Sequence, residues 1–378
     1  MKNVKKNIII SSHTLFDKKG NDIYGTGSSI TDYLSDKKIN HLYIKHPIYG
    51  GISTQIDVFW ENKKITFKNK SSNSTNLLLK SLQELIITLR IIFKQPKKFD
   101  IFIGIDPLNA FFGWIAKKLG KVQRLVFYTA DYTPTRFDNK IFNWIYHAID
   151  RLMLKKADEI WNVSTRITGL RKKQGVPEIK NYFVPNSPMF NKIKRLNIDK
   201  INKHELVFVT TSAKSTDFSV IFKALKKLSS KYPDIILRVI GLNNWEDQFE
   251  EEIAKLGIDK KVLFSGRMPH VSLLKIFCKA AVGLALYTNK FSWTYYSDSM
   301  KARDYLACGL PVIMTDISST AQDVKKADAG FVIKLDSNEL FKVIDRLFAD
   351  VKYYSLLRNN ATKLAEKYDI YRILDKRL

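Results

Sequence analysis

Short apolar runs alternate with stretches of helical periodicity along the whole chain. Four runs lie in the first half and six follow after residue 205, each separated from the next by enough residues for a helix. The runs are 8–10, 101–104, 125–128, 159–163, 206–209, 235–240, 262–264, 282–286, 311–314 and 330–333. Strands that alternate with helices are typical of parallel sheets, so the two series predict an α/β chain with two doubly wound, Rossmann-like domains.

Pro185 and Pro188 interrupt this pattern between the two series. A polar, lysine-rich stretch without a strand follows them, and two prolines so close together stop regular structure. We therefore predict a boundary here, and a helical tail that crosses back to the first domain. The predicted parts are a first domain over residues 1–186, a solvated linker over 187–204, a second domain over 205–355 and a C-terminal helix over 356–378.

The composition of the 378 residues, 45% of them hydrophobic, is that of a folded protein. Lysine and arginine number 63 against 37 aspartates and glutamates, a net charge of +26. Residues 1–200 hold 35 basic and 16 acidic side chains (+19), and the remainder hold 28 and 21 (+7). This asymmetry indicates an anionic partner for the first half, either nucleic acid, a membrane surface or a phosphorylated substrate. Nucleic acid is the weakest of these because the charge is dispersed over an α/β chain.

The cysteines and the apolar stretches indicate in which cellular compartment the protein is expected. Cys278 and Cys308 cannot build a disulfide framework, and no cysteine or histidine cluster has zinc spacing. The isoleucines at 8–10 are too few for a signal-peptide core, and no stretch has the length needed to span a bilayer. The sequence therefore predicts a cytoplasmic protein.

Residues 295–313 form the stretch that says most about function. A polar loop precedes a helical pattern, a glycine and a buried strand. Small polar residues at Ser297 and Ser299 would leave backbone N–H groups free at a helix start, which suits a phosphate. Lys301 would add a positive charge to the same anion, and Asp304 would accept hydrogen bonds from sugar hydroxyls one turn later.

The same residues have a purely structural interpretation. Asp298 or Ser299 would cap the helix, and Lys301 and Asp304 would form an ordinary ion pair three residues apart. Spacing alone does not separate the two interpretations.

The segment also resembles a known family. Residues 301–311 fit K-x-x-[ED]-Y-x-A-x-G-x-P, which is similar to the nucleotide-sugar segment of GT-B glycosyltransferases, in particular group 1 enzymes and the xanthan-type glucuronosyltransferases. The resemblance implies that Met300 and Lys301 touch the nucleotide and diphosphate, and that Asp304 binds ribose. The larger retaining group has two glutamates eight positions apart, of which the second falls on Asp304 and the first on Tyr296. This departure leaves the donor-sugar contact and the stereochemical outcome open.

Two further segments fit the same resemblance. Residues 262–269 match the family's V-x-F-x-G-x-x-P element, which makes Arg267 a candidate phosphate partner or else a surface arginine after a turn. Lys214 follows the first strand of the second series, where related enzymes place a phosphate-binding lysine.

The first half offers a glycine-rich turn and two candidate bases. Gly25 and Gly27 lead into a helical pattern and could cradle an anion by their amides; Ile30 at the third glycine position weakens a dinucleotide fingerprint. Asp131 follows a buried strand and is our first candidate to deprotonate the acceptor in an inverting transfer. His13 is its rival, and Asp22 or the absence of any protein base remain alternatives.

Together these features predict a glycosyltransferase with a nucleotide-sugar donor, a UDP-sugar by preference, and a membrane-associated or polyprenyl-linked glycan acceptor in cell-surface polysaccharide synthesis. No D-x-D pair occurs, so we expect neither a metal nor another cofactor. A nucleotide-sugar 2-epimerase of the same fold is the alternative enzyme. The sequence does not indicate an oligomeric state.

Two basic, apolar segments relate to the membrane. Residues 77–94 and 144–156 combine helical periodicity with lysine and arginine at their ends. They can pack on the sheet as core helices, or present basic and aromatic side chains to an anionic leaflet. The second possibility predicts a peripheral enzyme at the inner face of the cell membrane.

Overall fold

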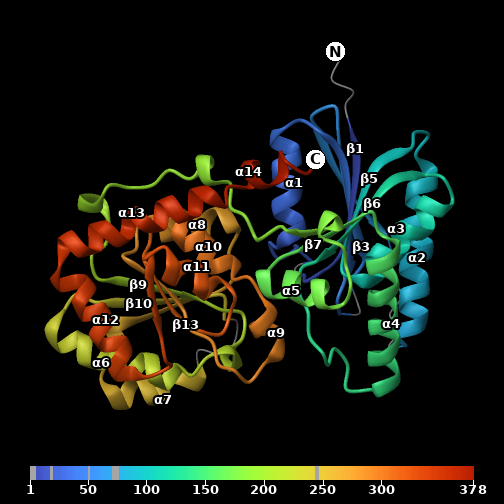
Figure 1. Cartoon of the computed structure of the whole chain (residues 1–378). Helices are drawn as coiled ribbons and strands as arrows, with labels where there is room; N and C mark the ends of the chain where they lie inside the picture. Colours follow the sequence, from blue (N-terminus) through green and yellow to red (C-terminus); the bar gives the residue numbers. More distant parts are fainter. Residues whose placement is uncertain (1–5, 18–19, 50–51, 70–75, 243–246) are drawn as a thin grey trace. The chain divides into compact units, whose positions relative to one another are not determined.

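The computed structural model describes residues 6–17, 20–49, 52–69, 76–242 and 247–378. The chain forms two compact units, Met1–Pro185 and Asn186–Leu378, each built around its own sheet (Figure 1).

The first unit contains an eight-stranded sheet in the order β4-β3-β2-β1-β5-β6-β7-β8. Its strands are β1 (Asn7–Thr14), β2 (Asn40–Pro47), β3 (Thr54–Trp60), β4 (Lys63–Asn69), β5 (Phe99–Ile105), β6 (Val122–Thr129), β7 (Glu159–Asn162) and β8 (Asn181–Phe183). All neighbours pair in parallel except β2 with β3 and β3 with β4, so an antiparallel hairpin forms one edge.

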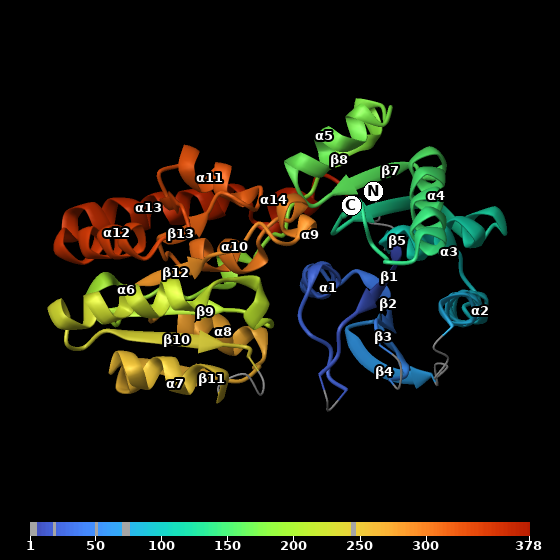
Figure 2. The same cartoon turned by 90° about the horizontal axis from the view of Figure 1, so that it is seen from below.

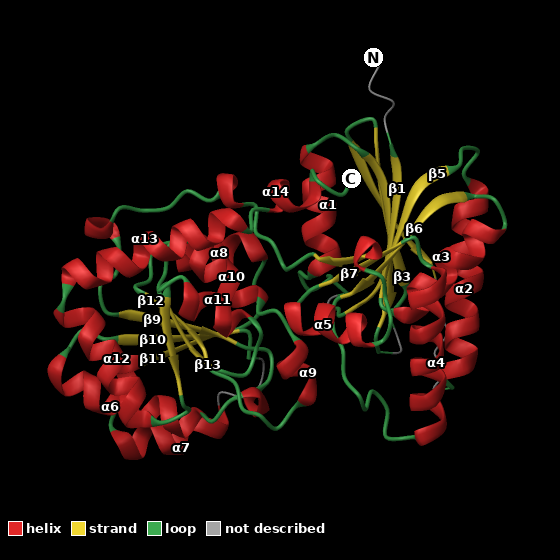
Figure 3. Ribbon diagram, in the orientation of Figure 1, coloured by secondary structure: helices red, strands yellow, loops and turns green. Residues whose placement is uncertain are grey.

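Helix α1 lies on one face of this sheet, and α2, α3 and α4 lie on the other (Figures 2 and 3). The helices are α1 (Thr26–Asp36), α2 (Leu77–Lys94), α3 (Pro107–Lys118), α4 (Lys140–Lys156) and α5 (Thr165–Lys173). The chain passes from β1 out to β4 and then returns to β5, which makes the space between β1 and β5 the topological switch point. Ligands of such sheets bind beyond the carboxyl ends of the strands at that point.

The second unit contains a six-stranded parallel sheet in the order β11-β10-β9-β12-β13-β14, with a switch point between β9 and β12. Its strands are β9 (Glu205–Val209), β10 (Ile236–Ile240), β11 (Val262–Ser265), β12 (Val282–Ala285), β13 (Val312–Thr315) and β14 (Gly330–Ile333). Its helices are α6 (Phe218–Lys231), α7 (Asp247–Leu256), α8 (His270–Phe277), α9 (Ser292–Tyr296), α10 (Met300–Ala307), α11 (Thr320–Lys326), α12 (Ser337–Ala349), α13 (Val351–Lys367) and α14 (Ile370–Leu374).

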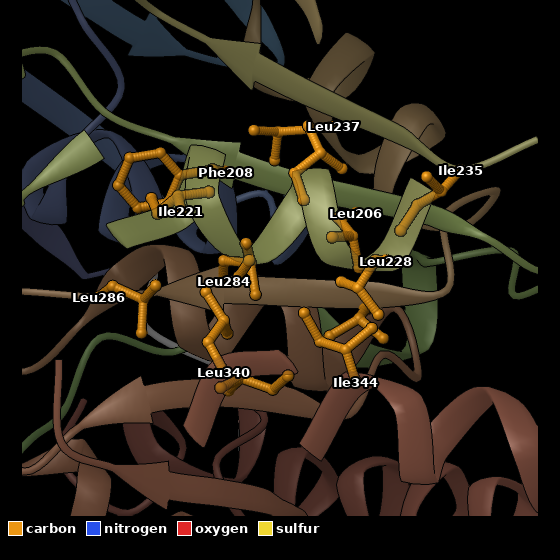
Figure 4. Packing of buried hydrophobic residues seen from close by; sticks show 14 of the residues in the cluster. Leu206, Phe208, Ile221, Leu228, Ile235, Leu237, Leu284, Leu286, Leu340 and Ile344 are labelled. Atoms are coloured by element: carbon orange, nitrogen blue, oxygen red, sulfur yellow. The ribbon is translucent and has the colours of Figure 1, made fainter. Parts of the chain in front are cut away.

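Alternation along the strands gives the second sheet two separate cores. Leu206 and Phe208 of β9 point to the face covered by α6 and α12, where they pack with Ile221 and Ile344 (Figure 4). Val207, between them, points to the face covered by α8, α10, α11 and α13. Loops at the carboxyl edge of the sheet therefore divide into two groups, one above each face.

Two of the predicted boundaries are wrong. Residues 187–204 are not a solvated linker: Phe190, Ile193 and Ile201 are buried in the second unit, and short helical turns at Phe190–Lys192 and Ile198–Lys200 give the stretch local order. The predicted start of the last helix at 356 falls inside α13, because Asp350 caps that helix by accepting from the Tyr353 N–H.

No helix within the described ranges is both long enough and apolar enough to cross a membrane.

Candidate active site

The start of α10 is fixed at the carboxyl edge of the second sheet. Ser299 caps the helix, since its Oγ accepts from the Ala302 N–H at 3.3 Å. The Ser299 N–H donates to Thr320 Oγ1 at 2.8 Å, and its hydroxyl lies 2.7 Å from that of Tyr287. The first amides of the helix, at Met300 and Lys301, precede the intrahelical hydrogen-bond ladder and carry the positive end of the helix dipole.

A buried ion pair holds the turn before this helix. The Asp298 carboxylate accepts from Arg303 Nη2 at 2.8 Å, from Thr320 Oγ1 at 2.8 Å and from the Asn186 N–H at 3.0 Å. Burial alone would lower the pKa of Arg303, but the carboxylates of Asp298 and Asp323 raise it above its ordinary value. Asp298 thus has a structural role, which the cap interpretation of the sequence had partly anticipated.

Lys301 is the candidate anion ligand. Its Nζ donates to the carbonyl of Val209, at the end of β9, at 2.5 Å, and lies 5.3 Å from the centre of the Tyr287 ring. Among the described residues no carboxylate forms an ion pair with it, and burial lowers its pKa from 10.5 to about 8. The i,i+3 pair of the structural interpretation is therefore absent. A cation with little solvent, and without a counter-charge from the described residues, remains at the helix start.

Asp304 pairs instead with a residue that the sequence did not suggest. Its Oδ2 lies 2.8 Å from Nε2 of His270, the first residue of α8, and both side chains are largely buried. The contact joins α8 to α10. Since 34 positions separate the two residues, no local pattern could have revealed the pair.

The other residues predicted to bind the donor, Ser297, Met300 and Arg267, differ in their exposure and in their hydrogen bonds. The Ser297 hydroxyl donates to the Thr294 carbonyl at 2.8 Å, and the Ser297 carbonyl accepts from the Ser319 N–H at 3.1 Å. Met300 is half-buried at the first helical position. Arg267 is exposed in the loop between β11 and α8, two residues after the last residue of β11 and three before His270.

Lys214 lies apart from these residues. It is exposed on the short turn Ala213–Ser215 after β9, and it lines a pocket of about 910 Å³. Tyr287 also lines this pocket, whereas Arg267 and residues 297–304 do not. The pocket opens above the face covered by α6, α7 and α12, so the structure divides the predicted donor residues between two sides of the carboxyl edge.

In the first unit the glycine-rich turn begins α1. Gly25 is the N-cap residue, and its carbonyl accepts from the Ser29 N–H at 3.0 Å. A Cβ on Gly27 would lie 2.2 Å from the hydroxyl oxygen of Tyr43, so packing already requires a glycine there. Whether the turn also binds an anion stays a prediction.

Asp131 follows β6, as predicted, and is exposed. Its Oδ2 accepts from Arg136 Nη1 at 2.8 Å. Burial would lower the pKa of Arg136, but the Asp131 carboxylate raises it above its ordinary value. As a base, Asp131 would act beside a permanent cation.

His13 sits at the switch point between β1 and β5 with both ring nitrogens occupied. Nδ1 lies 2.7 Å from Asp106 Oδ2, and Nε2 lies 3.1 Å from Oε2 of the buried Glu84 on α2. Burial would lower the pKa of His13, but the Asp106 and Glu84 carboxylates raise it from 6.5 to about 10. In this arrangement His13 is an imidazolium without a free lone pair, which argues against it as the base.

Within the described ranges, no three histidine, cysteine, aspartate or glutamate side chains are grouped so that they could hold a metal ion.

Comparison with known proteins finds a family match for most of the second unit. Residues 190–364 match the family model for glycosyl transferases group 1. The matched region contains the whole cluster around α10 and α8, including Lys301, Asp304 and His270.

One curated relative matches part of the chain. The chitobiosyldiphosphodolichol beta-mannosyltransferase of Candida albicans is 26% identical over 157 residues, 40% of this chain and 34% of that protein. The match thus spans about a third of that relative's length.

Solved structures match nearly the whole chain. The Anabaena HepE structure in complex with UDP-glucose has a TM-score of 0.69 and 14% identity, covering 98% of this chain and 97% of that one. A glycosyltransferase from Rickettsia africae also has a TM-score of 0.69, with 15% identity over 99% of this chain and 97% of that one. The chain therefore has the GT-B fold, as predicted, and the residues that match the group 1 model lie in its second Rossmann-like unit.

Proposed function

We propose that this chain transfers a sugar from a nucleotide-sugar donor, a UDP-sugar by preference, to a membrane-associated or lipid-linked glycan in cell-surface polysaccharide synthesis. One observation carries the proposal. The Lys301 ammonium group lies at the start of α10 in the region that matches the group 1 model, desolvated and without a carboxylate partner in the described part of the chain. A diphosphate is the anion that such a position favours, because helix amides and a buried cation both stabilise it.

The other residues of the cluster fit the remaining parts of the donor. The Asp304 carboxylate, held by His270, would accept hydrogen bonds from ribose hydroxyls through Oδ1, which forms no hydrogen bond with a described residue. Ser297, Ser299 and Met300 supply the backbone that surrounds the phosphates, and Arg267 supplies a cation from the neighbouring loop. Neutralisation by these groups is the basis for expecting transfer without a metal.

The first unit would bind the acceptor. Gly25 and Gly27 begin α1 with amides that could contact an anion, and Asp131 would take the proton from the attacking hydroxyl while the nucleoside diphosphate leaves. This assignment favours inversion at the anomeric carbon, because a base that activates the acceptor opposite the leaving group gives a single displacement.

Association with the inner face of the membrane would use α2 and α4. The first turns of α2 expose Leu78, Leu79 and Leu82, each by more than half, and α4 exposes Trp144 by 66%. Arg90 and the lysines that follow α2 add positive charge to the same unit. Exposed leucine and tryptophan beside basic residues are typical of surfaces that bind anionic lipid. The relative from Candida is named for a lipid-linked substrate, chitobiosyldiphosphodolichol.

Calorimetry with UDP tests the donor site directly. Lys301→Ala should weaken UDP binding by about tenfold to a hundredfold, the usual effect of removing a charged partner from a phosphate. Lys275→Ala, which removes an exposed lysine from α8, is the matched control and should bind UDP as the wild type does. Equal affinity of Lys301→Ala and wild type would exclude the diphosphate role. A thermal-shift screen of UDP-sugars, NAD and single-stranded DNA then separates the donor class from the alternatives.

A further inference from the structure

The pocket lined by Lys214 has a composition that the donor site does not explain. It encloses about 910 Å³ at the carboxyl edge of the second sheet, between the beginnings of α6 and α7 and the loops that follow β12, β13 and β14. Its apolar lining, which includes Phe218 and Leu335, belongs to the core above the α6 and α12 face. The cluster around Lys301 and Asp304 lies on the other face.

Opposite charges share this pocket without pairing. Three carboxylates and three ammonium groups line it, and none of the six forms an ion pair with any described residue. They are Asp217, Glu252, Asp316, Lys214, Lys290 and Lys334. Because the numbers are equal, the lining side chains carry no net formal charge. An anionic ligand would therefore meet as many repulsive as attractive groups, and a neutral ligand would meet hydrogen-bond acceptors and donors in equal supply.

Polar groups without partners also line the pocket. The hydroxyl oxygens of Thr216 and Thr288 are buried and have no hydrogen-bond partner among the described residues. Thr216 is only 7% exposed. A buried hydroxyl left in this state is unfavourable, and a ligand hydroxyl, which both donates and accepts, could supply the missing partner. The amide side chains of Gln248 and Asn289 complete a polar rim.

An aromatic wall lies beside these groups. Phe249, which lines the pocket, packs on Phe218 with ring centroids 4.5 Å apart and lies parallel to Phe264 at 6.1 Å. Its orientation is therefore fixed by two other rings. A fixed ring next to hydroxyl, amide and carboxylate groups suits a ligand that has both an apolar C–H face and a periphery of hydroxyls.

We propose that this pocket binds an uncharged saccharide, separately from the nucleotide-sugar site. Pyranose rings combine a C–H face, which packs on Phe249, with hydroxyls that donate to Glu252 and Asp316 and accept from the lysines. The volume lies within the range of about 300–1,000 Å³ that ligand sites occupy, so a short oligosaccharide fits. The inference rests on the pocket alone and would survive failure of the donor assignment.

The experiment uses the full chain, first on an array of neutral oligosaccharides and then in calorimetry with the strongest array ligand. Glu252→Gln keeps the shape of the side chain and removes its charge, and it should lower the affinity for that ligand by about tenfold. Asn289→Ala should lower the affinity by a similar factor. The matched control is Glu251→Gln, because Glu251 is exposed on the same helix, pairs with Lys255 and does not line the pocket. The affinity for UDP should be unchanged in all three variants.

Each other outcome overturns the proposal. An array on which the wild-type chain binds no neutral oligosaccharide contradicts it, as does binding that Glu252→Gln and Asn289→Ala leave unchanged while both variants keep the wild-type melting temperature. Loss of UDP affinity in Glu252→Gln would assign the pocket to the nucleotide instead. Lys301→Ala should keep the saccharide affinity, which distinguishes this site from the proposed donor site.

Discussion

Nε2 of His270 and Oδ2 of Asp304 lie 2.8 Å apart, and this contact joins the first residue of α8 to the second turn of α10. A carboxylate held in this way keeps one oxygen for the histidine and presents the other in a fixed direction. Under the proposed function we expect the second oxygen to bind ribose.

Asp304→Asn should therefore lower the affinity for UDP by at least about tenfold, because a hydrogen bond to a charged group contributes roughly 1.5–3 kcal/mol. The same substitution should lower the affinity much less for the 2′,3′-dideoxy analogue of UDP, because that analogue lacks the ribose hydroxyls. Calorimetry on both ligands and both proteins forms a double-mutant cycle. If the asparagine variant loses the same factor with either ligand, Asp304 does not contact the ribose.

Lys301 makes UDP binding depend on pH. Burial lowers the pKa of its ammonium group from 10.5 to about 8 in the free protein, so the lysine is charged below about pH 8 and neutral above. We expect the affinity for UDP to be constant between pH 7 and 8 and to fall by up to about tenfold per pH unit above that. Binding should take up protons in that upper range, visible in calorimetry with buffers of different ionisation enthalpy.

The control for this prediction is Lys301→Arg, whose charge persists to high pH and should flatten the profile. An unchanged pH dependence in Lys301→Met would show that another group titrates.

Asp131→Asn should lower turnover by about 10²–10⁴-fold and leave UDP affinity intact, since a general base acts on the acceptor and not on the donor. The measurement is transfer of radiolabel from the best-stabilising UDP-sugar into extracted membrane lipids. Arg136→Lys keeps the cation beside Asp131 and serves as the milder comparison. Full turnover by the asparagine variant would remove Asp131 from the mechanism.

His13 makes the stability of the first unit depend on pH in a defined direction. Asp106 and Glu84 overcome the effect of burial and raise its pKa from 6.5 to about 10, so the folded state binds the proton more tightly than the unfolded chain. The resulting stabilisation is complete below pH 6.5 and disappears as the pH rises through about 10. The difference in unfolding free energy between wild type and His13→Asn should therefore shrink steadily across this window in urea titrations.

His147→Asn is the matched control, because His147 bonds to the Pro134 carbonyl and not to a carboxylate. If the difference in unfolding free energy between wild type and His13→Asn stays constant from pH 6.5 to 10, the ion pairs of His13 do not contribute to stability as proposed.

The sequence predicted the parallel strands well because burial on both faces makes them continuously apolar. All ten predicted runs are strands. Strands β2, β3, β4 and β8 were not predicted. β2 is wholly buried yet contains Lys45, which is compensated by Asp57 at 3.0 Å, and β4 is wholly exposed, so neither has the expected apolar pattern. Pairing across the sheet, which periodicity does not encode, determines these strands.

In the site, too, contacts within one helix could be predicted, whereas contacts between elements far apart in the sequence could not. The cap at Ser299 could be predicted, since it depends on residues within one helical turn. The partner of Asp304 could not, because His270 comes from another helix, and neither could the separation of Lys214 from Lys301, which depends on the face of the sheet that each loop covers.

The exposed leucines of α2 lead to the last prediction. Leu78 and Leu82 are 54% and 53% exposed, whereas Ile87 and Ile92 of the same helix are buried against the sheet, so the outer face can change without disturbing the core. We expect the chain to sediment with vesicles of anionic phospholipid at low salt and less at high salt, because screening weakens the contribution of the basic residues.

The double variant Leu78→Glu/Leu82→Glu should bind these vesicles at least about tenfold more weakly, since each inserted leucine contributes roughly 1.5–3 kcal/mol and each glutamate repels the lipid. Leu356→Glu changes a leucine of similar exposure (50%) on α13, in the other unit, and should bind as the wild type does. Equal losses in both proteins would mean that added negative charge alone, and not the α2 surface, determines binding. Absence of sedimentation at low salt would rule out this route to the membrane, because electrostatic attraction is strongest there.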